Sequence, residues 1–205
     1  KRKVTASTYE ILVDGAKAES CIVTTPYENL HILPSSLDLA AAELEISDKK
    51  GRESILKNAL LPIKQYYDYI IIDCPPSLGL ITTNALTASD TFLVPIQCEY
   101  YALEGLTQLM STVRRIKRQY NNTIDIEGVL LTMYDGRLNL TQQVVEEVKK
   151  FFPRKVFKTV IPRGVRLSEA PSFGMPVIYY DKNCKGSITY TELAKEIIEK
   201  ERSYE

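Results

Sequence analysis

The sequence has 205 residues, 44% of them hydrophobic, and its 26 basic residues balance 26 acidic ones. This length fits a single α/β domain over residues 1–205, and the charge balance excludes a polybasic tail or a wholly acidic chain. The cysteines are far apart and no apolar run approaches the roughly 18 residues of a membrane span, so we expect a cytoplasmic protein without zinc fingers, disulfides or membrane contact.

The first third of the chain predicts short helices and weak strands. A helix over 5–13 begins at Thr5 or Ser7, either of which can serve as its cap. Further helices are predicted over 35–46, 51–66 (ended or kinked by Pro62) and 78–88, with extended segments over 21–24 and 30–33.

Three consecutive isoleucines lie in the stretch Tyr67–Asp73, which is followed by Cys-Pro-Pro-Ser. A continuous β-branched run predicts a strand buried on both faces, and Asp73 stands at its carboxyl end. Such an acid has two readings. It either caps the following turn or meets a metal or phosphate in the crevice of a parallel sheet.

Buried strands and amphipathic helices alternate through the rest of the chain. Strands are predicted over 91–97, 128–134 and 156–161, and helices over 103–120, 139–152 (with Asn139 and Gln142 as a capping box) and after Gly186. The alternation predicts an α/β fold with a mostly parallel sheet and helices on both faces.

The loops that follow these strands collect the polar chemistry. They supply Asp73, several prolines and several arginines, a set that suits a nucleotide triphosphate with its Mg²⁺. The 205 residues contain no G-x-x-x-x-G-K-[ST] phosphate loop, and the single histidine, His31, lies in an apolar segment and suits a structural role.

Basic residues concentrate late in the chain. From Arg137 to Lys185 there are ten Lys or Arg against four acidic residues, a difference of six. This excess fits sequence-independent binding of a phosphate backbone, but an ordinary mixed surface explains it equally well at this point.

Four motifs in order together resemble the ParA-type partitioning ATPases, deviant Walker P-loop proteins related to the MinD type. They are YDYIIIDCPPS, VPIQCEYYALEG, LTMYDGR and VIPRGVRLSEAPS, beginning at residues 67, 94, 131 and 160. The resemblance covers the chain from about residue 8 to the last helix, and it implies a P-loop NTPase-like fold. The family's lysine-rich phosphate loop and switch segment have no counterpart in these residues, so we expect an N-terminally incomplete ATPase domain.

The resemblance also assigns roles to individual residues. Asp73 is similar to the Walker B carboxylate, which makes it the catalytic and Mg²⁺-side residue, directly or through water. The resemblance implies a nucleotide site at Asp73, Pro75, Met133, Pro162, Arg163 and Gly164, where Gly164 departs from a frequent Asn. It implies DNA binding at Arg137 and Arg166 and, more weakly, at Lys182 and Lys185.

The first functional hypothesis is therefore an ATP-dependent chromosome or plasmid partitioning ATPase that binds double-stranded DNA without sequence preference as an ATP-bound homodimer. The family implies ATP and Mg²⁺ as cofactors, a ParB-type partner and a nucleoid-associated location. Because the phosphate loop is not in this chain, we expect no ATP hydrolysis by these residues alone. The alternative is a non-enzymatic DNA-binding or partner-binding module on the same fold. A small-molecule enzyme is disfavoured because no nucleophile or acid–base pair occurs in the loops.

Overall fold

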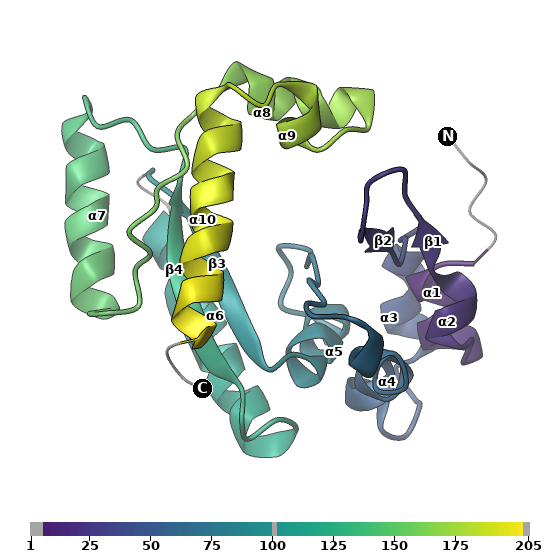
Figure 1. Ribbon diagram of the computed structural model, residues 1–205. Coiled ribbons are helices and arrows are strands. Elements are labelled where there is room, and N and C mark those ends of the chain that lie inside the picture. The colour runs from purple at the N-terminus through teal and green to yellow at the C-terminus, as the bar shows by residue number, and fades with distance from the viewer. Residues whose placement is uncertain (1–5, 100–101, 203–205) are drawn as a thin grey trace. The chain divides into compact units, whose positions relative to one another are not determined.

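The computed structural model describes residues 6–99 and 102–202 (Figure 1). Its contacts divide the chain into two compact units. The first comprises residues up to Asp90 together with Leu109–Ile124, and the second comprises Thr91–Gln108 and the residues from Asp125 onward. The prediction of one domain over 1–205 stays a prediction.

Short helices make up most of the first unit. They are α1 (Thr8–Asp14), α2 (Ala18–Cys21), α3 (Leu39–Glu45), α4 (Ile55–Leu60), α5 (Leu80–Ala88), the 3-10 helices η1 (Arg52–Ser54) and η2 (Lys64–Tyr66), and the second half of α6 (Ala102–Gln119). The strands β1 (Val23–Thr24) and β2 (His31–Ile32) form a small antiparallel pair. In the hydrophobic core of the first unit, the fully buried Ile11 and Leu12 of α1 cluster with Leu56 and Leu60 of α4.

Ser7 caps α1, as one of the two predicted alternatives. Its Oγ accepts a hydrogen bond from the Tyr9 N–H at 3.2 Å, and the Glu10 carboxylate accepts one from the Ser7 N–H at 2.6 Å. Together these bonds form a capping box that satisfies donors which the helix itself leaves unpaired.

The buried strand predicted for Tyr67–Asp73 is wrong. The segment is irregular, and Ile71 is 91% exposed. A strand with β-branched side chains on both faces needs neighbouring strands to pair its backbone and layers to cover its faces. Within the described residues no strand pairs with this segment, so its β-branched residues have no neighbouring backbone with which to form a sheet.

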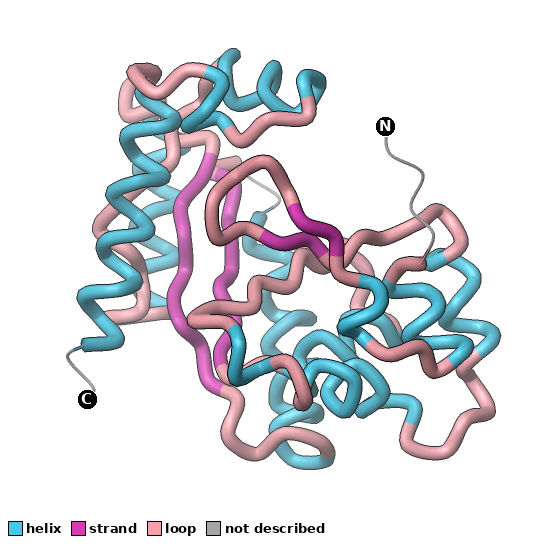
Figure 2. The backbone as a smooth tube through the Cα atoms, turned by 45° about the vertical axis from the view of Figure 1, so that its right-hand side comes forward, coloured by secondary structure: helices cyan, strands magenta, loops and turns pink. Residues whose placement is uncertain are grey.

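A parallel strand pair organises the second unit (Figure 2). β3 (Thr91–Gln97) and β4 (Asp125–Thr132) run side by side from Thr91 opposite Asp125 to Gln97 opposite Thr132, with one irregularity after Phe92. Both strands were predicted, although β4 begins three residues earlier than expected. The helical elements of this unit are the start of α6, α7 (Asn139–Phe151), α8 (Val165–Glu169), η3 (Ala170–Phe173), α9 (Val177–Tyr180) and α10 (Lys185–Arg202).

The strand predicted for 156–161 forms only in part. The Phe157 N–H donates to the Val129 carbonyl at 3.0 Å, and the Ile161 N–H donates to the Leu131 carbonyl at 2.9 Å. Phe157 and Ile161 are four residues apart, but their partners Val129 and Leu131 on β4 are only two residues apart. The regular ladder of hydrogen bonds is therefore interrupted between these two contacts. The side chains of Phe157 and Ile161 still pack with Leu130 and with Leu193 of α10.

The predicted capping box of Asn139 and Gln142 is also wrong. Leu138 occupies the cap position of α7 and makes no side-chain capping bond. The Gln142 amide instead donates to the Tyr134 hydroxyl at 3.5 Å, outside the helix.

In the described part of the chain, no helix combines the length and the apolar character needed to cross a membrane.

Candidate functional site

Asp73 lies in the irregular stretch of the first unit that leads into α5, and both it and the following Pro75 are exposed. Among the described residues the Asp73 carboxylate forms no hydrogen bond or ion pair, and no group of three metal-ligating side chains is present. Mg²⁺ commonly takes only one or two protein carboxylates, with waters and phosphate oxygens completing its shell. An exposed carboxylate without a protein partner fits that role.

The loops after the strands of the second unit bring two of the predicted nucleotide-site residues together. The Tyr134 N–H donates to the Ile161 carbonyl at 3.0 Å, and Tyr134 and Pro162 pair as parallel neighbours. Met133 therefore lies beside the buried Pro162, and it is 40% exposed. Its φ of 52° is a left-handed conformation that costs a side-chain-bearing residue about 1 kcal/mol or more.

Arg163 extends from the same loop to the segment after β3. Its Nη2 lies 2.9 Å from Oε1 of Glu99, with both side chains more than half exposed, so the pair contributes at most about 1 kcal/mol. Gly164 is the cap residue of α8, and a Cβ built there would lie 3.8 Å from the nearest Leu167 atom. The position therefore has room for a side chain such as the Asn that the resemblance leads us to expect.

Asp135 holds Arg137 by a two-pronged contact. Arg137 Nε lies 2.9 Å from Oδ1, Nη2 lies 2.7 Å from Oδ2, and the Arg137 backbone N–H also donates to Oδ1 at 3.1 Å. These hydrogen bonds, with a smaller contribution from the Arg163 charge, lower the pKa of Asp135 to about 2. The Arg137 side chain remains 88% exposed, so the contact fixes the guanidinium while leaving it open to solvent.

Arg166 stands on α8 and faces two acids. Its Nη1 lies 2.8 Å from Oε2 of Glu169, and its Nε lies 3.4 Å from Oδ2 of Asp181. The second contact places α8 beside the turn that carries Lys182 and leads to Lys185 at the start of α10. Both lysines are exposed, and neither forms an ion pair within the described residues.

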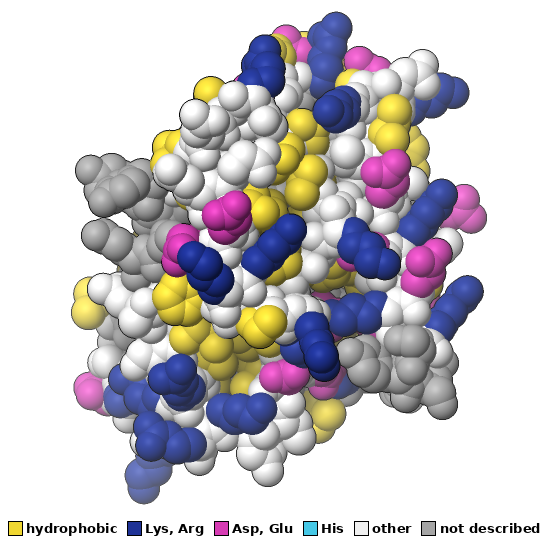
Figure 3. Space-filling model, turned by 90° about the vertical axis from the view of Figure 1, so that its left-hand side faces the viewer, with side chains coloured by type: hydrophobic (Ala, Val, Ile, Leu, Met, Phe, Trp, Pro, Cys, Tyr) yellow, Lys and Arg dark blue, Asp and Glu magenta, His cyan; other side chains and the backbone are white. Residues whose placement is uncertain are grey.

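The second unit thus collects its predicted site residues along consecutive loops. Figure 3 draws one face of the molecule, on which Lys and Arg side chains lie among Asp and Glu side chains. The exposed arginines can bind phosphate oxygens, and the exposed part of the Met133 side chain offers an apolar surface for a flat ring. The sequence interpretation gave no role to Glu99 or Asp135, the acids that hold two of the arginines. Both stand in loops directly after strands, and that position was the available signal.

Comparisons with known proteins agree with this architecture. A family model described as an AAA domain matches residues 1–126. The chain is 57% identical over 197 residues to the sporulation initiation inhibitor protein Soj of Bacillus subtilis, covering 96% of this chain and 78% of that protein. It is 47% identical over 198 residues to the chromosome partitioning protein ParA of Myxococcus xanthus, covering 97% of this chain and 70% of that protein.

Solved structures with the same fold include nucleotide-bound ones. A cobyrinic acid a,c-diamide synthase from Mycobacterium smegmatis, with a bound ATP analogue and magnesium, superposes with a TM-score of 0.84 at 32% identity, over 99% of this chain and 75% of that one. The cell division ATPase MinD of Pyrococcus furiosus, at 23% identity, shares the fold with a TM-score of 0.76 over 97% of this chain and 77% of that one.

These matches establish the predicted P-loop NTPase-like α/β fold, with its parallel sheet and helices. The identity to several partitioning proteins extends over nearly the whole chain, far beyond what a shared fold requires. The chain belongs to the ParA/Soj family of chromosome-partitioning ATPases, within the ParA/MinD superfamily.

Proposed function

We propose that this chain is the Walker B-containing and DNA-binding portion of an ATP-dependent chromosome-partitioning ATPase. The observation that carries the proposal is the 57% identity to Soj of Bacillus subtilis over 96% of the chain. In this proposal Asp73 holds Mg²⁺ at the nucleotide phosphates, while Pro75, Met133, Pro162, Arg163 and Gly164 contribute to the nucleotide-binding surface.

The same proposal assigns the binding of duplex DNA to Arg137, Arg166, Lys182 and Lys185. Their exposure supports this role, because a cation that reaches solvent can replace the counterions of a phosphate backbone. Non-specific binding by an ATP-bound homodimer, a ParB-type partner and a nucleoid-associated location complete the proposal. A role in plasmid segregation is the corresponding variant.

Nucleotide binding is tested by titrating a fluorescent ATP analogue into the protein with and without Mg²⁺. Replacing Asp73 with Asn should remove the part of the affinity that depends on Mg²⁺, because a neutral amide is a poorer ligand for a hard cation. Asp68→Asn, which removes one exposed carboxylate five residues earlier, serves as the control. Equal Mg²⁺ dependence in both variants would refute the role of Asp73.

DNA binding is tested by measuring affinity for duplexes of arbitrary sequence over a range of salt concentrations. The Arg137→Ala/Arg166→Ala variant should bind more weakly, and its log–log salt slope should fall by about 2, close to 0.9 for each lost phosphate contact. A Lys17→Ala/Lys57→Ala variant loses the same charge from exposed positions in the first unit and should keep the slope. An unchanged slope in the arginine variant would sink the assignment.

The second candidate is a DNA-binding module without ATPase activity. The exposed Arg137, Arg166, Lys182 and Lys185 support it, because these cations need no bound nucleotide to reach a phosphate backbone. Salt-dependent DNA binding together with no Mg²⁺-dependent nucleotide binding by these residues would support it. ATP turnover that disappears in Asp73→Asn would exclude it.

A further inference from the structure

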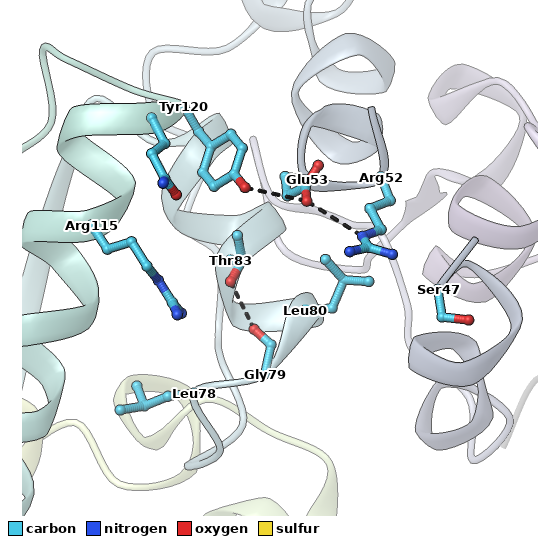
Figure 4. Close-up of a pocket in the computed structure, with 10 residues that line it drawn as sticks. Ser47, Arg52, Glu53, Leu78, Gly79, Leu80, Thr83, Arg115 and Tyr120 are labelled. Carbon is cyan, nitrogen blue, oxygen red and sulfur yellow. Dashed lines mark hydrogen bonds and ion pairs between the residues drawn. The ribbon is translucent and has the colours of Figure 1, made fainter. Parts of the chain in front are cut away.

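A pocket of about 440 Å³ lies within the first unit and takes no part in the function proposed above. Figure 4 shows its main residues, which come from η1, from the start of α5 and from the end of α6. Its volume falls in the range of roughly 300–1,000 Å³ that is common for ligand pockets. Its walls mix apolar and cationic side chains, chiefly Leu78, Leu80, Arg52, Arg115 and Tyr120.

Two buried asparagines fix the walls of this pocket. Asn84 of α5 accepts a hydrogen bond from the Leu56 N–H at 3.1 Å and donates to the Arg52 carbonyl at 2.7 Å, which ties η1 and α4 to α5. Asn121, directly after α6, donates to the carbonyls of Leu86 and Ser89 at 3.0 and 2.7 Å. The elements that carry the two arginines are therefore anchored to the same helix.

The pocket has more positive charge than its own residues neutralise. Its one acidic lining residue, Glu53, already accepts from Arg52 Nε and from the Tyr120 hydroxyl, each at 3.3 Å. Arg115 forms no ion pair within the described residues. In Figure 4 the guanidinium groups of Arg52 and Arg115 lie on either side of Leu80 and Thr83, which leaves donors available on both flanks.

The last turns of α6 extend this positive charge beyond the pocket. Arg114, Lys117 and Arg118 are exposed, and none pairs with an acid in the described part of the chain. Residues at i, i+3 and i+4 share one helix face, so these three cations form a single surface beside Arg115. Cations near the C-terminus of a helix are also stabilised by the helix dipole, but that interaction requires neither the pocket nor a shared helix face.

We propose that this pocket and the adjoining end of α6 bind an acidic peptide segment of a protein partner, with an apolar side chain entering between Leu78 and Leu80. Charge complementarity selects an anionic occupant, and the concave apolar walls select one that carries hydrophobic side chains between its carboxylates. A duplex presents phosphates on a convex surface and gives Leu78 and Leu80 nothing to contact. Arg52 and Arg115 each bind a carboxylate, and the three outer cations attract the flanking acids.

Fluorescence polarisation tests the proposal with a labelled peptide of sequence Asp-Glu-Leu-Asp-Glu-Leu and the whole protein. We expect saturable binding tighter than about 1 mM, weakened by salt and lost when Asn and Gln replace the acids. Arg115→Gln and Arg52→Gln should each lower the affinity about tenfold, the usual effect of losing a charged hydrogen bond. Lys57→Gln removes one exposed cation elsewhere in this unit and should change nothing.

Three outcomes would overturn the proposal. They are no saturable binding, equal binding of the uncharged peptide, and equal effects of Arg115→Gln and Lys57→Gln. Displacement of the peptide by inorganic phosphate alone at matched ionic strength would reassign the pocket to a small anion. A short duplex that binds in the peptide's place, with loss of affinity in Arg115→Gln, would reassign the surface to nucleic acid. None of these peptide-binding experiments depends on Arg137 or Asp73. The peptide-binding proposal can therefore fail while the proposed partitioning function stands.

Discussion

Asn121 allows a sharp test of how the end of α6 is held, because its donors point at backbone oxygens. The residue is 6% exposed, and its Nδ2 lies 3.0, 3.3 and 2.7 Å from the carbonyl oxygens of Leu86, Thr87 and Ser89. Replacing it with Asp keeps the shape but exchanges the NH2 group, with its two N–H donors, for a single oxygen atom. At neutral pH a buried negative charge then faces three carbonyl dipoles.

The expected losses differ between two substitutions. Asn121→Ala removes about two net hydrogen bonds, worth about 1 kcal/mol each, and leaves carbonyls unpaired, so we expect the free energy of unfolding to fall by roughly 2–4 kcal/mol. Asn121→Asp should cost more at pH 7, because the carboxylate is both desolvated and repelled. The control is Asn122→Asp, which makes the same change at the next residue, where the side chain is exposed.

The pH dependence of Asn121→Asp has a definite sign. Burial and the carbonyl oxygens favour the neutral acid, so the folded-state pKa of the new side chain lies above its unfolded value. Stability is then greatest below the unfolded pKa and is lost as the pH rises through the folded pKa. Urea unfolding followed by circular dichroism at several pH values measures this directly. The reasoning is refuted if Asn121→Asp is as stable as Asn122→Asp at pH 7, or if its stability rises with pH relative to that control.

Three further outcomes follow from the geometry. Gly128→Ala should destabilise by about 1–3 kcal/mol in urea unfolding, because the new Cβ would lie 2.5 Å from the buried Phe157 ring; Gly105→Ala, with open space around it, should not, and equal effects would contradict this. Ser7→Ala should cost about 1 kcal/mol through loss of the α1 cap, and unchanged stability would show that the cap contributes nothing. Asp135 should titrate near pH 2 by carbon-13 NMR, so its stabilising contact is fully present above its unfolded pKa and is lost only as the pH falls through about 2; titration near pH 4 would mean that its arginine contact does not form.

Local signals were sufficient for much of the fold. β3 occupies its predicted residues, and α5 and α6 lie close to theirs, because helix periodicity and β-branched content act within each segment. The predicted order of strands and helices identified the fold class for the same reason. The strand predicted at Tyr67–Asp73 does not form, because a strand exists only with partners that its own segment does not contain.

The site showed the same division. Sequence pattern placed Met133 and Pro162 in loops after strands, and the structure brings those loops together. The pairing of Asp135 with Arg137 depends on a turn that aligns two side chains, and the contact of Arg163 with Glu99 joins residues 64 positions apart. Neither pairing produces a periodic pattern in the sequence. Only the three-dimensional structure shows which arginines form ion pairs with these acids.

The exposed Ile70–Ile71 stretch has a consequence for the behaviour of the protein in solution. Both side chains favour strands, and two acids, Asp68 and Asp73, flank them in the manner of gatekeeper residues that discourage self-association. Repulsion between such charges reaches only about 8 Å at physiological ionic strength and less at higher salt. Adding salt should therefore promote association of copies through this stretch, and light scattering of wild type and Ile71→Lys across a salt series would reveal it.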